Sequence, residues 1–126
     1  MKETFYKGAM GNLSLLSITV SLSALAANGT EVLADKLPIG TQVVGVRHTS
    51  AALGANTEVT VALVDKAGAS TSLLVATTTS ASASVAPVKP VYIGDNGASD
   101  LVLTNTGTAD ATGEVTVQLE YRFKGY

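Results

Sequence analysis

The chain of 126 residues contains no cysteine and no tryptophan, and aromatic residues make up only 5% of it. The lack of cysteine excludes disulfide bonds, thiolate nucleophiles and metal sites with cysteine ligands. The lack of tryptophan counts against a carbohydrate-binding module, because such modules stack sugar rings on aromatic side chains. These absences remove several common kinds of functional site before any motif is considered.

Charged residues are also scarce, at 14% of the chain with a net charge of −2. A nucleic-acid-binding protein needs a clustered excess of Lys and Arg to displace counterions, so we expect no nucleic-acid partner. The hydrophobic fraction of 46% is sufficient for a core and fits one domain at this length. The surface must then consist mainly of Ser, Thr, Ala and Gly, which suits a protein that lies against neighbouring subunits.

The residues that commonly carry catalysis form no recognisable pattern. His48 is the single histidine, and a catalytic histidine needs a nucleophile and an orienting carboxylate, but the chain has no GxSxG motif. We expect His48 to lie at a strand end, at the margin of a sheet. Glu58, Glu114 and Glu120 are expected on solvated strand faces, outside the apolar pocket that a catalytic acid requires. The chain is therefore predicted to be no enzyme and to hold no cofactor.

Oxygen-bearing side chains gather in two loops, with Asp95, Asn96 and Asp100 in the first and Asp110 in the second. Such loops can bind calcium. Their spacing lacks the alternating Asp and Asn register of a calcium-binding loop, and the same residue types favour tight turns. We expect turns and no metal, with calcium as the alternative for the loop from Asp95 to Asp100.

The apolar segment 13–27 has two interpretations. Lys2 and Lys7 precede it and Ala24-Leu25-Ala26 resembles a cleavage site, as in a signal peptide. From Leu16 onward, however, apolar and hydroxyl residues alternate with a period of two, which is typical of a half-buried strand. We expect the strand. A membrane span is not expected, because it needs about 20 apolar residues.

Further strand-like segments, separated by turn residues, follow to the end of the chain. The last one, 114–123, alternates most clearly, so its apolar residues are expected to face inward. These residues are Val115, Val117, Leu119, Tyr121 and Phe123. The other expected strands are 31–37, 41–49, 57–65, 70–77, 91–93 and 101–105.

Two segments are harder to assign. The sequence TTTSASASVA at 77–86 fits either a flat strand or a flexible loop, and Pro87 and Pro90 are expected to prevent a regular central strand. The segment 50–56 is expected to be a connection with room for one helical turn.

About eight short strands without a sustained helical period indicate an all-β fold, a single-domain β-sandwich. We expect a jelly-roll arrangement. An immunoglobulin-like sandwich is the second choice, because its usual Cys and Trp core residues are absent. The sandwich is expected to span 13–126, after an N-terminal arm of residues 1–12.

Two segments resemble parts of small virion proteins of tailed phages. Residues 37–46, LPIGTQVVGV, are similar to a Leu-Pro-x-Gly-x-x-Val strand start, and residues 112–121, TGEVTVQLEY, are similar to a terminal strand. The resemblance implies a β-sandwich or jelly roll that binds the major capsid protein on the outside of a phage head, as a decoration (cementing) protein. The alternative is a secreted or surface bacterial β-sandwich, either an adhesin or pilus component or a carbohydrate-binding module.

Self-association is expected as well, as a homodimer or homotrimer. Several strands carry only Ser, Thr and Ala on their polar side, and small side chains lose little rotamer entropy on contact. The arm carries Phe5, Tyr6 and Met10 and is too short to form its own core. We expect these three residues to form a contact arm that becomes ordered on a partner. The alternative is that the arm completes an edge of its own sheet.

Overall fold

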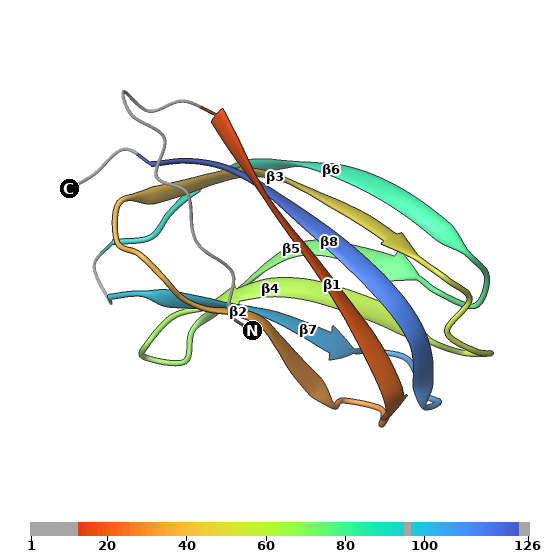
Figure 1. Ribbon diagram of the computed structural model, residues 1–126. Helices are drawn as coiled ribbons and strands as arrows, with labels where there is room; N and C mark the ends of the chain where they lie inside the picture. The colour runs from red at the N-terminus through yellow and green to blue at the C-terminus, as the bar shows by residue number, and fades with distance from the viewer. Residues whose placement is uncertain (1–12, 95–96, 124–126) are drawn as a thin grey trace.

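The computed structural model describes residues 13–94 and 97–123, and every regular element in these residues is a β-strand (Figure 1). The eight strands are β1 (Leu13–Leu25), β2 (Thr30–Leu37), β3 (Thr41–Ser50), β4 (Glu58–Val64), β5 (Ser70–Thr77), β6 (Ser82–Tyr92), β7 (Ser99–Asn105) and β8 (Ala111–Phe123). The described part of the chain accordingly has no helix of the length and hydrophobicity that a membrane crossing requires.

The strands form two four-stranded antiparallel sheets that lie one over the other (Figure 1). The first sheet has the order β1-β8-β3-β6 and the second has the order β2-β7-β4-β5. The chain crosses from one sheet to the other at every connection except the one between β4 and β5. This connectivity is that of an eight-stranded jelly roll, so the expected fold is confirmed and the immunoglobulin-like alternative is wrong.

The core lies between the two sheets and takes side chains from both. β8 contributes most clearly, because Val115, Val117, Leu119 and Tyr121 are each 0% exposed. Its intervening polar residues point outward, and Phe123 is only half-buried at the end of the strand. The alternation expected for this strand is therefore confirmed.

β1 confirms the strand interpretation of the N-terminal apolar run. Leu16, Ile18 and Leu22 are buried, while the hydroxyl residues between them are exposed. β1 pairs with β8 in an unbroken register from Leu13 to Leu22. The period of two in this segment arises because one face of the strand is buried and the other is in water.

β6 corrects two expectations. It is one continuous strand from Ser82 to Tyr92, although a break was expected at Pro87 and Pro90. Both prolines are tolerated because β6 is an edge strand. Among the described strands its one partner is β3, so half of its N–H groups have no ladder partner there to lose. The segment 51–57, in turn, is a loop with a turn at Ala55 and Asn56 and contains no helical turn.

A bulge in β3 changes which of its residues face the core. The register with β8 shifts between Val43 and Gly45, so that Val43, Val46 and His48 point inward. Val44, which has the same parity as Val46 and His48, is only half-buried, because a bulge inserts one residue and inverts the alternation at this point.

Candidate contact surfaces

The predicted contact arm lies outside the described residues. Phe5, Tyr6 and Met10 all precede Leu13, where β1 begins. Their role therefore remains a prediction. The described chain fixes only the point at which the arm leaves the domain, which is the start of an edge strand of the first sheet.

The two acidic loops are described in part. Asp95 and Asn96 lie outside the described residues. The Asp100 carboxylate accepts a hydrogen bond of 3.0 Å from the backbone N–H of Lys36, which joins β7 to the end of β2. Within the described residues, no three His, Asp or Glu side chains are grouped closely enough to hold a metal ion. For Asp100, the structural role expected of a turn carboxylate accounts for its geometry.

The three glutamates lie on outward faces, as expected. Glu120 forms an ion pair of 3.2 Å with Arg47, and the two side chains are 23% and 50% exposed. Glu58 accepts a hydrogen bond of 2.8 Å from the hydroxyl of Thr106. Glu114 is exposed at the far end of β8. None of the three lies in an apolar pocket that would suit a general acid.

His48 lies in the core and not at the margin of a sheet, so this expectation is wrong. Its side chain is 1% exposed, and it stands between Val117 of β8 and Ser84 of β6 in the register of the first sheet. Neither ring nitrogen has a hydrogen-bond partner among the described residues. Burial lowers the pKa of His48 below its ordinary value of 6.5, because the apolar interior disfavours the charged ring. Among the described residues, no nucleophile or carboxylate forms a hydrogen bond with the ring.

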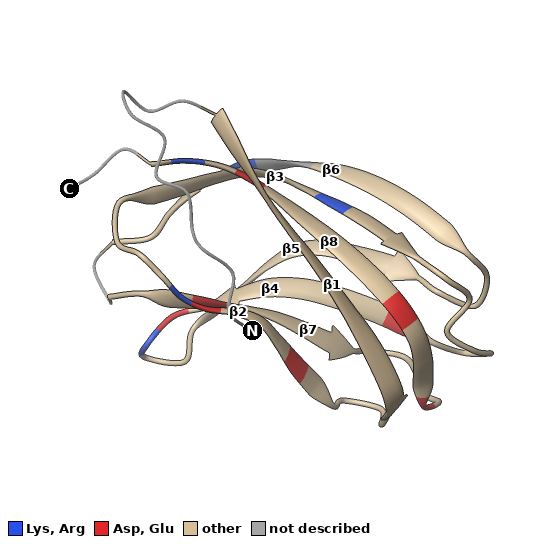
Figure 2. Cartoon of the chain, viewed as in Figure 1, with Lys and Arg blue, Asp and Glu red and all other residues tan. Residues whose placement is uncertain are grey.

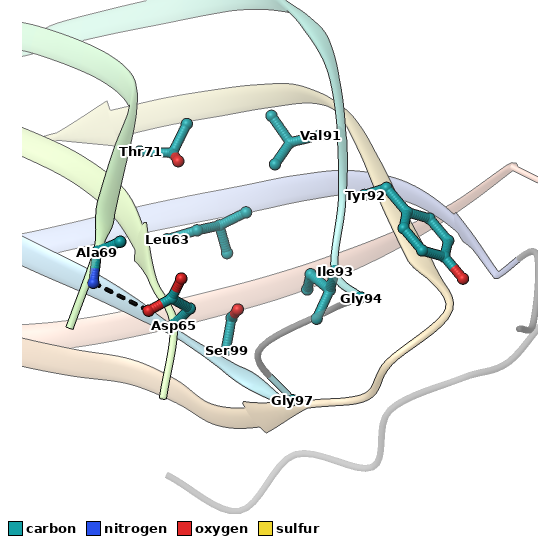
Figure 3. Close-up of a pocket in the computed structure, with 10 residues that line it drawn as sticks. All are labelled: Leu63, Asp65, Ala69, Thr71, Val91, Tyr92, Ile93, Gly94, Gly97 and Ser99. Atoms are coloured by element: carbon teal, nitrogen blue, oxygen red, sulfur yellow. Dashed lines mark hydrogen bonds between the residues drawn. The ribbon is translucent and has the colours of Figure 1, made fainter. Parts of the chain in front are cut away.

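One pocket opens between the sheets at the end of the molecule where β4 turns into β5 (Figure 3). It has a volume of about 200 Å³, and Leu63, Thr71 and Val91 point into it. Asp65 lies at its rim, but this carboxylate accepts hydrogen bonds of 2.9 Å from the N–H groups of Ala67 and Ala69 and so stabilises the β4–β5 turn. The pocket is thus a small hollow with a largely polar lining, and the carboxylate at its rim is engaged in the turn.

Asn105 organises the opposite end of the sandwich and was not singled out from the sequence. It is 0% exposed. Its amide donates hydrogen bonds of 2.8 Å to the carbonyls of Leu25 and Ala109, and its side-chain oxygen accepts one of 3.1 Å from the N–H of Gly107. One buried side chain therefore joins the end of β1 to the β7–β8 loop. In the sequence this residue resembles any turn asparagine.

The outer face of the second sheet carries no charge over its middle. Two rows of paired residues cross all four strands, and we call these eight residues the uncharged face. The rows are Thr30-Thr104-Thr60-Val75 and Val32-Val102-Ala62-Ser72. Val32 and Val75 are 44% and 57% exposed. Figure 2 shows the middle of β4, β5 and β7 free of charged residues, whereas charges occur along β8 and β3 of the first sheet.

No protein-family model and no curated protein matches the chain. Solved structures do. A chain of the cyanophage Pam1 capsid asymmetric unit is 19% identical with a TM-score of 0.66, and the match covers 98% of this chain and 93% of that one. A chain of the acid-stable capsid of Helicobacter pylori bacteriophage KHP30 is 15% identical with a TM-score of 0.57, covering 90% and 89%.

A third similar structure comes from Bacillus endospore appendages, which are disulfide-linked pili. It is 17% identical with a TM-score of 0.50, and the match covers 98% of this chain and 99% of that one. At these identities the likeness concerns the fold. It confirms that the chain resembles phage capsid structures in architecture, as the two sequence segments indicated.

Proposed function

We propose that this protein is a structural component of a phage virion, and that it binds the outer surface of the head as a decoration (cementing) protein. The observation that carries the proposal is the likeness to the Pam1 capsid chain, which spans 98% of this chain and 93% of the other. The correspondence is therefore between two whole domains of similar size. A structural protein also needs no catalytic group, cofactor, nucleic acid or membrane, and none is part of the proposal.

The proposed partners are the major capsid protein and further copies of the chain itself. The uncharged face supports this, because its Thr, Ser, Ala and Val side chains can be covered without removing an ion from water. Its exposed valines would also gain from burial against another apolar surface. The proposed location is the outside of the virion.

The direct test uses purified heads of the phage that encodes the chain. We expect the protein to be present in them by mass spectrometry, and antibodies against the isolated domain to label intact heads in electron micrographs. Heads assembled without it should form normally but should release DNA at a lower temperature, as expected when a cementing contact is missing. Absence of the protein from purified heads would refute the proposal.

The contact arm is tested separately, by deleting residues 2–10. If Phe5, Tyr6 and Met10 contact a partner, the shortened protein keeps its melting temperature and loses binding to heads. A shortened protein that unfolds would show that the arm completes its own sheet. One that binds heads as before would also contradict the arm as a capsid contact.

A second candidate is a pilus-type surface protein, which the Bacillus appendage structure supports. Those pili are disulfide-linked, and this chain has no cysteine for such a link. Filaments of this chain would have to be held by non-covalent contacts alone. Electron microscopy of the concentrated purified protein distinguishes the two candidates, because the virion proposal predicts no filaments.

A further inference from the structure

The two sheets have four edge strands, and three of them carry features that discourage pairing with another chain. β6 has Pro87 and Pro90, which lack N–H groups, and Lys89 between them. β2 has two register shifts and three charged residues, Glu31, Asp35 and Lys36. β5 is short, with eight residues, and a register shift between Val61 and Ala62 of its partner interrupts its pairing. Prolines, charges and bulges are the usual protections of a sheet edge.

β1, the remaining edge strand, has none of these protections over most of its length. Its 13 residues, LSLLSITVSLSAL, include no proline and no charge. Its register with β8 is unbroken from Leu13 to Leu22. Within residues 13–94 and 97–123, β8 is the one strand that pairs with it. In an antiparallel ladder every second residue directs its N–H and C=O groups away from the neighbouring strand, so this edge presents a regular row of backbone groups.

The side chains of β1 match a second copy of the same strand. In an antiparallel pair, residues directly opposite each other point to the same face of the sheet. A two-fold axis at Thr19, the midpoint of β1, places Thr19 opposite itself. In the central part of the strand it also brings like residues together, with Leu16 opposite Leu22, Ile18 opposite Val20, and Ser17 opposite Ser21. Over residues 16–22, apolar residues then meet apolar residues on the core side and hydroxyls meet hydroxyls on the outer side, and beyond them Leu15 stands opposite Ser23.

The absence of charge has a particular meaning in such a pair. Near a two-fold axis, each residue of β1 faces a residue of β1 in the second copy. A charged residue close to the axis would therefore lie near the same charge in the second copy. β1 has no charged residue. It also carries apolar surface that a second copy would cover, since Leu15 is 47% exposed and Val20 and Leu25 are only partly buried at the rim of the core.

From these observations we infer that β1 is the self-association surface of the protein. Two copies pair through antiparallel β1 strands about an axis at Thr19, which joins their first sheets into one continuous eight-stranded sheet. The inference rests on the self-association included in the proposed function, and it specifies a dimer among the two oligomers expected. Its test uses purified protein without capsids, so failure of capsid binding and failure of this pairing are separate results.

The first experiment places a charge at the axis. Thr19 and Ala83 lie in the same cross-strand row of the first sheet, Thr19-Thr116-Thr49-Ala83, at its two opposite edges, and both are exposed. In sedimentation equilibrium we expect wild type and Ala83→Lys to be dimers. Thr19→Lys should dimerise at least about tenfold more weakly, because two lysines face each other at the axis. Its circular dichroism spectrum should remain that of the folded protein, although the variant also loses the 2.9 Å hydroxyl contact with Thr116. A monomeric wild type, or a Thr19→Lys variant that dimerises as well as wild type, overturns the proposal.

The second experiment uses the lack of cysteine, which makes any introduced cysteine the only thiol. Directly opposite residues in a ladder have Cβ atoms close enough for a disulfide with small adjustments. Under mild oxidation Thr19→Cys should become a covalent dimer, and Ala83→Cys should remain mostly monomeric on denaturing gels. If both variants cross-link equally, or neither does, the β1 pairing is wrong. If deletion of residues 2–10 abolishes the dimer and Thr19→Cys does not cross-link, a neighbour's arm occupies the edge and the proposal is likewise wrong.

Discussion

The carboxylate of Glu120 on β8 lies over the bare Cα of Gly45 on β3, in the space that a side chain at position 45 would occupy. From there Glu120 reaches Arg47, two residues further along β3, at 3.2 Å. The glycine thus makes room for a cross-strand ion pair on the outer face of the first sheet. Its position also coincides with the bulge that turns His48 inward.

Gly45→Ala should have a small effect for this reason. The added methyl group displaces the flexible end of Glu120 and weakens an exposed ion pair, while alanine is preferred over glycine in a strand. We expect a change in unfolding free energy within about 1 kcal/mol, measured by urea denaturation. In a Glu120→Ala background, where the carboxylate is gone, the same substitution should stabilise the protein. Equal effects in both backgrounds would show that the two residues do not interact.

Gly107→Ala should behave differently, although it is the same chemical change. A Cβ at this position would lie 2.7 Å from the backbone N of Glu58 and 2.8 Å from the Cα of Thr57. Backbone atoms cannot rotate away as a glutamate side chain can, so the loop must move. We expect a loss of about 1–3 kcal/mol in urea denaturation. A stability equal to that of Gly45→Ala would mean that the β7–β8 loop adjusts freely.

Asn105→Ala should be among the more destabilising polar substitutions. It leaves the carbonyls of Leu25 and Ala109 without their donor inside a closed loop cluster. We expect a loss of about 2–4 kcal/mol in unfolding free energy. Asn105→Asp is the matched variant, because it keeps the acceptor for Gly107 and removes both donors. If the aspartate variant is as stable as wild type, the two carbonyl contacts are not what stabilises this end.

Val117→Asp tests the alternation on which the fold prediction depended. Val117 is 0% exposed, so an aspartate at this position would place an unpaired charge in the core. A loss of at least about 3 kcal/mol, or failure to fold, is expected. Gln118→Asp, one residue along on the outward side of the same strand, should melt close to wild type. Similar melting temperatures for the two variants would contradict the inward assignment.

These residues also show how far the sequence could lead. β8 and β1 were predictable because one face of each is buried and the other is in water, which leaves a period of two in the residues. β6 was not predictable, because proline is excluded from a central strand but tolerated in an edge strand. Local periodicity does not show which strands lie at the edges of a sheet. The inward residues of β3 could not be read from alternation for a related reason, since the bulge between Val43 and Gly45 inverts the alternation within the strand. Asn105 resembles an ordinary turn asparagine in the sequence, because Gly107 and Ala109 are local partners, and only its distant contact with Leu25 shows that it joins two parts of the fold.

The buried position of His48 leads to the last prediction, a dependence of stability on pH. Burial holds its folded-state pKa below 6.5, the ordinary value that the unfolded chain retains. As the pH falls through 6.5, the unfolded chain therefore binds the proton first, so the contribution to stability is complete above this pH and declines as the pH falls toward the folded-state pKa. The residues beside the ring in the sheet, Val117 and Ser84, carry no charge that could offset the protonated form.

We expect the melting temperature of wild type to fall between pH 7 and pH 5 more steeply than that of His48→Leu, which has no titrating group at this position. The leucine variant also removes two ring nitrogens that have no partner among the described residues, so it should be at least as stable as wild type at pH 5. Carboxylates titrate in both proteins, and the difference between the two curves isolates the histidine. Parallel curves over this range would show that His48 takes up its proton equally in the folded and unfolded chains, and the burial argument would then be wrong.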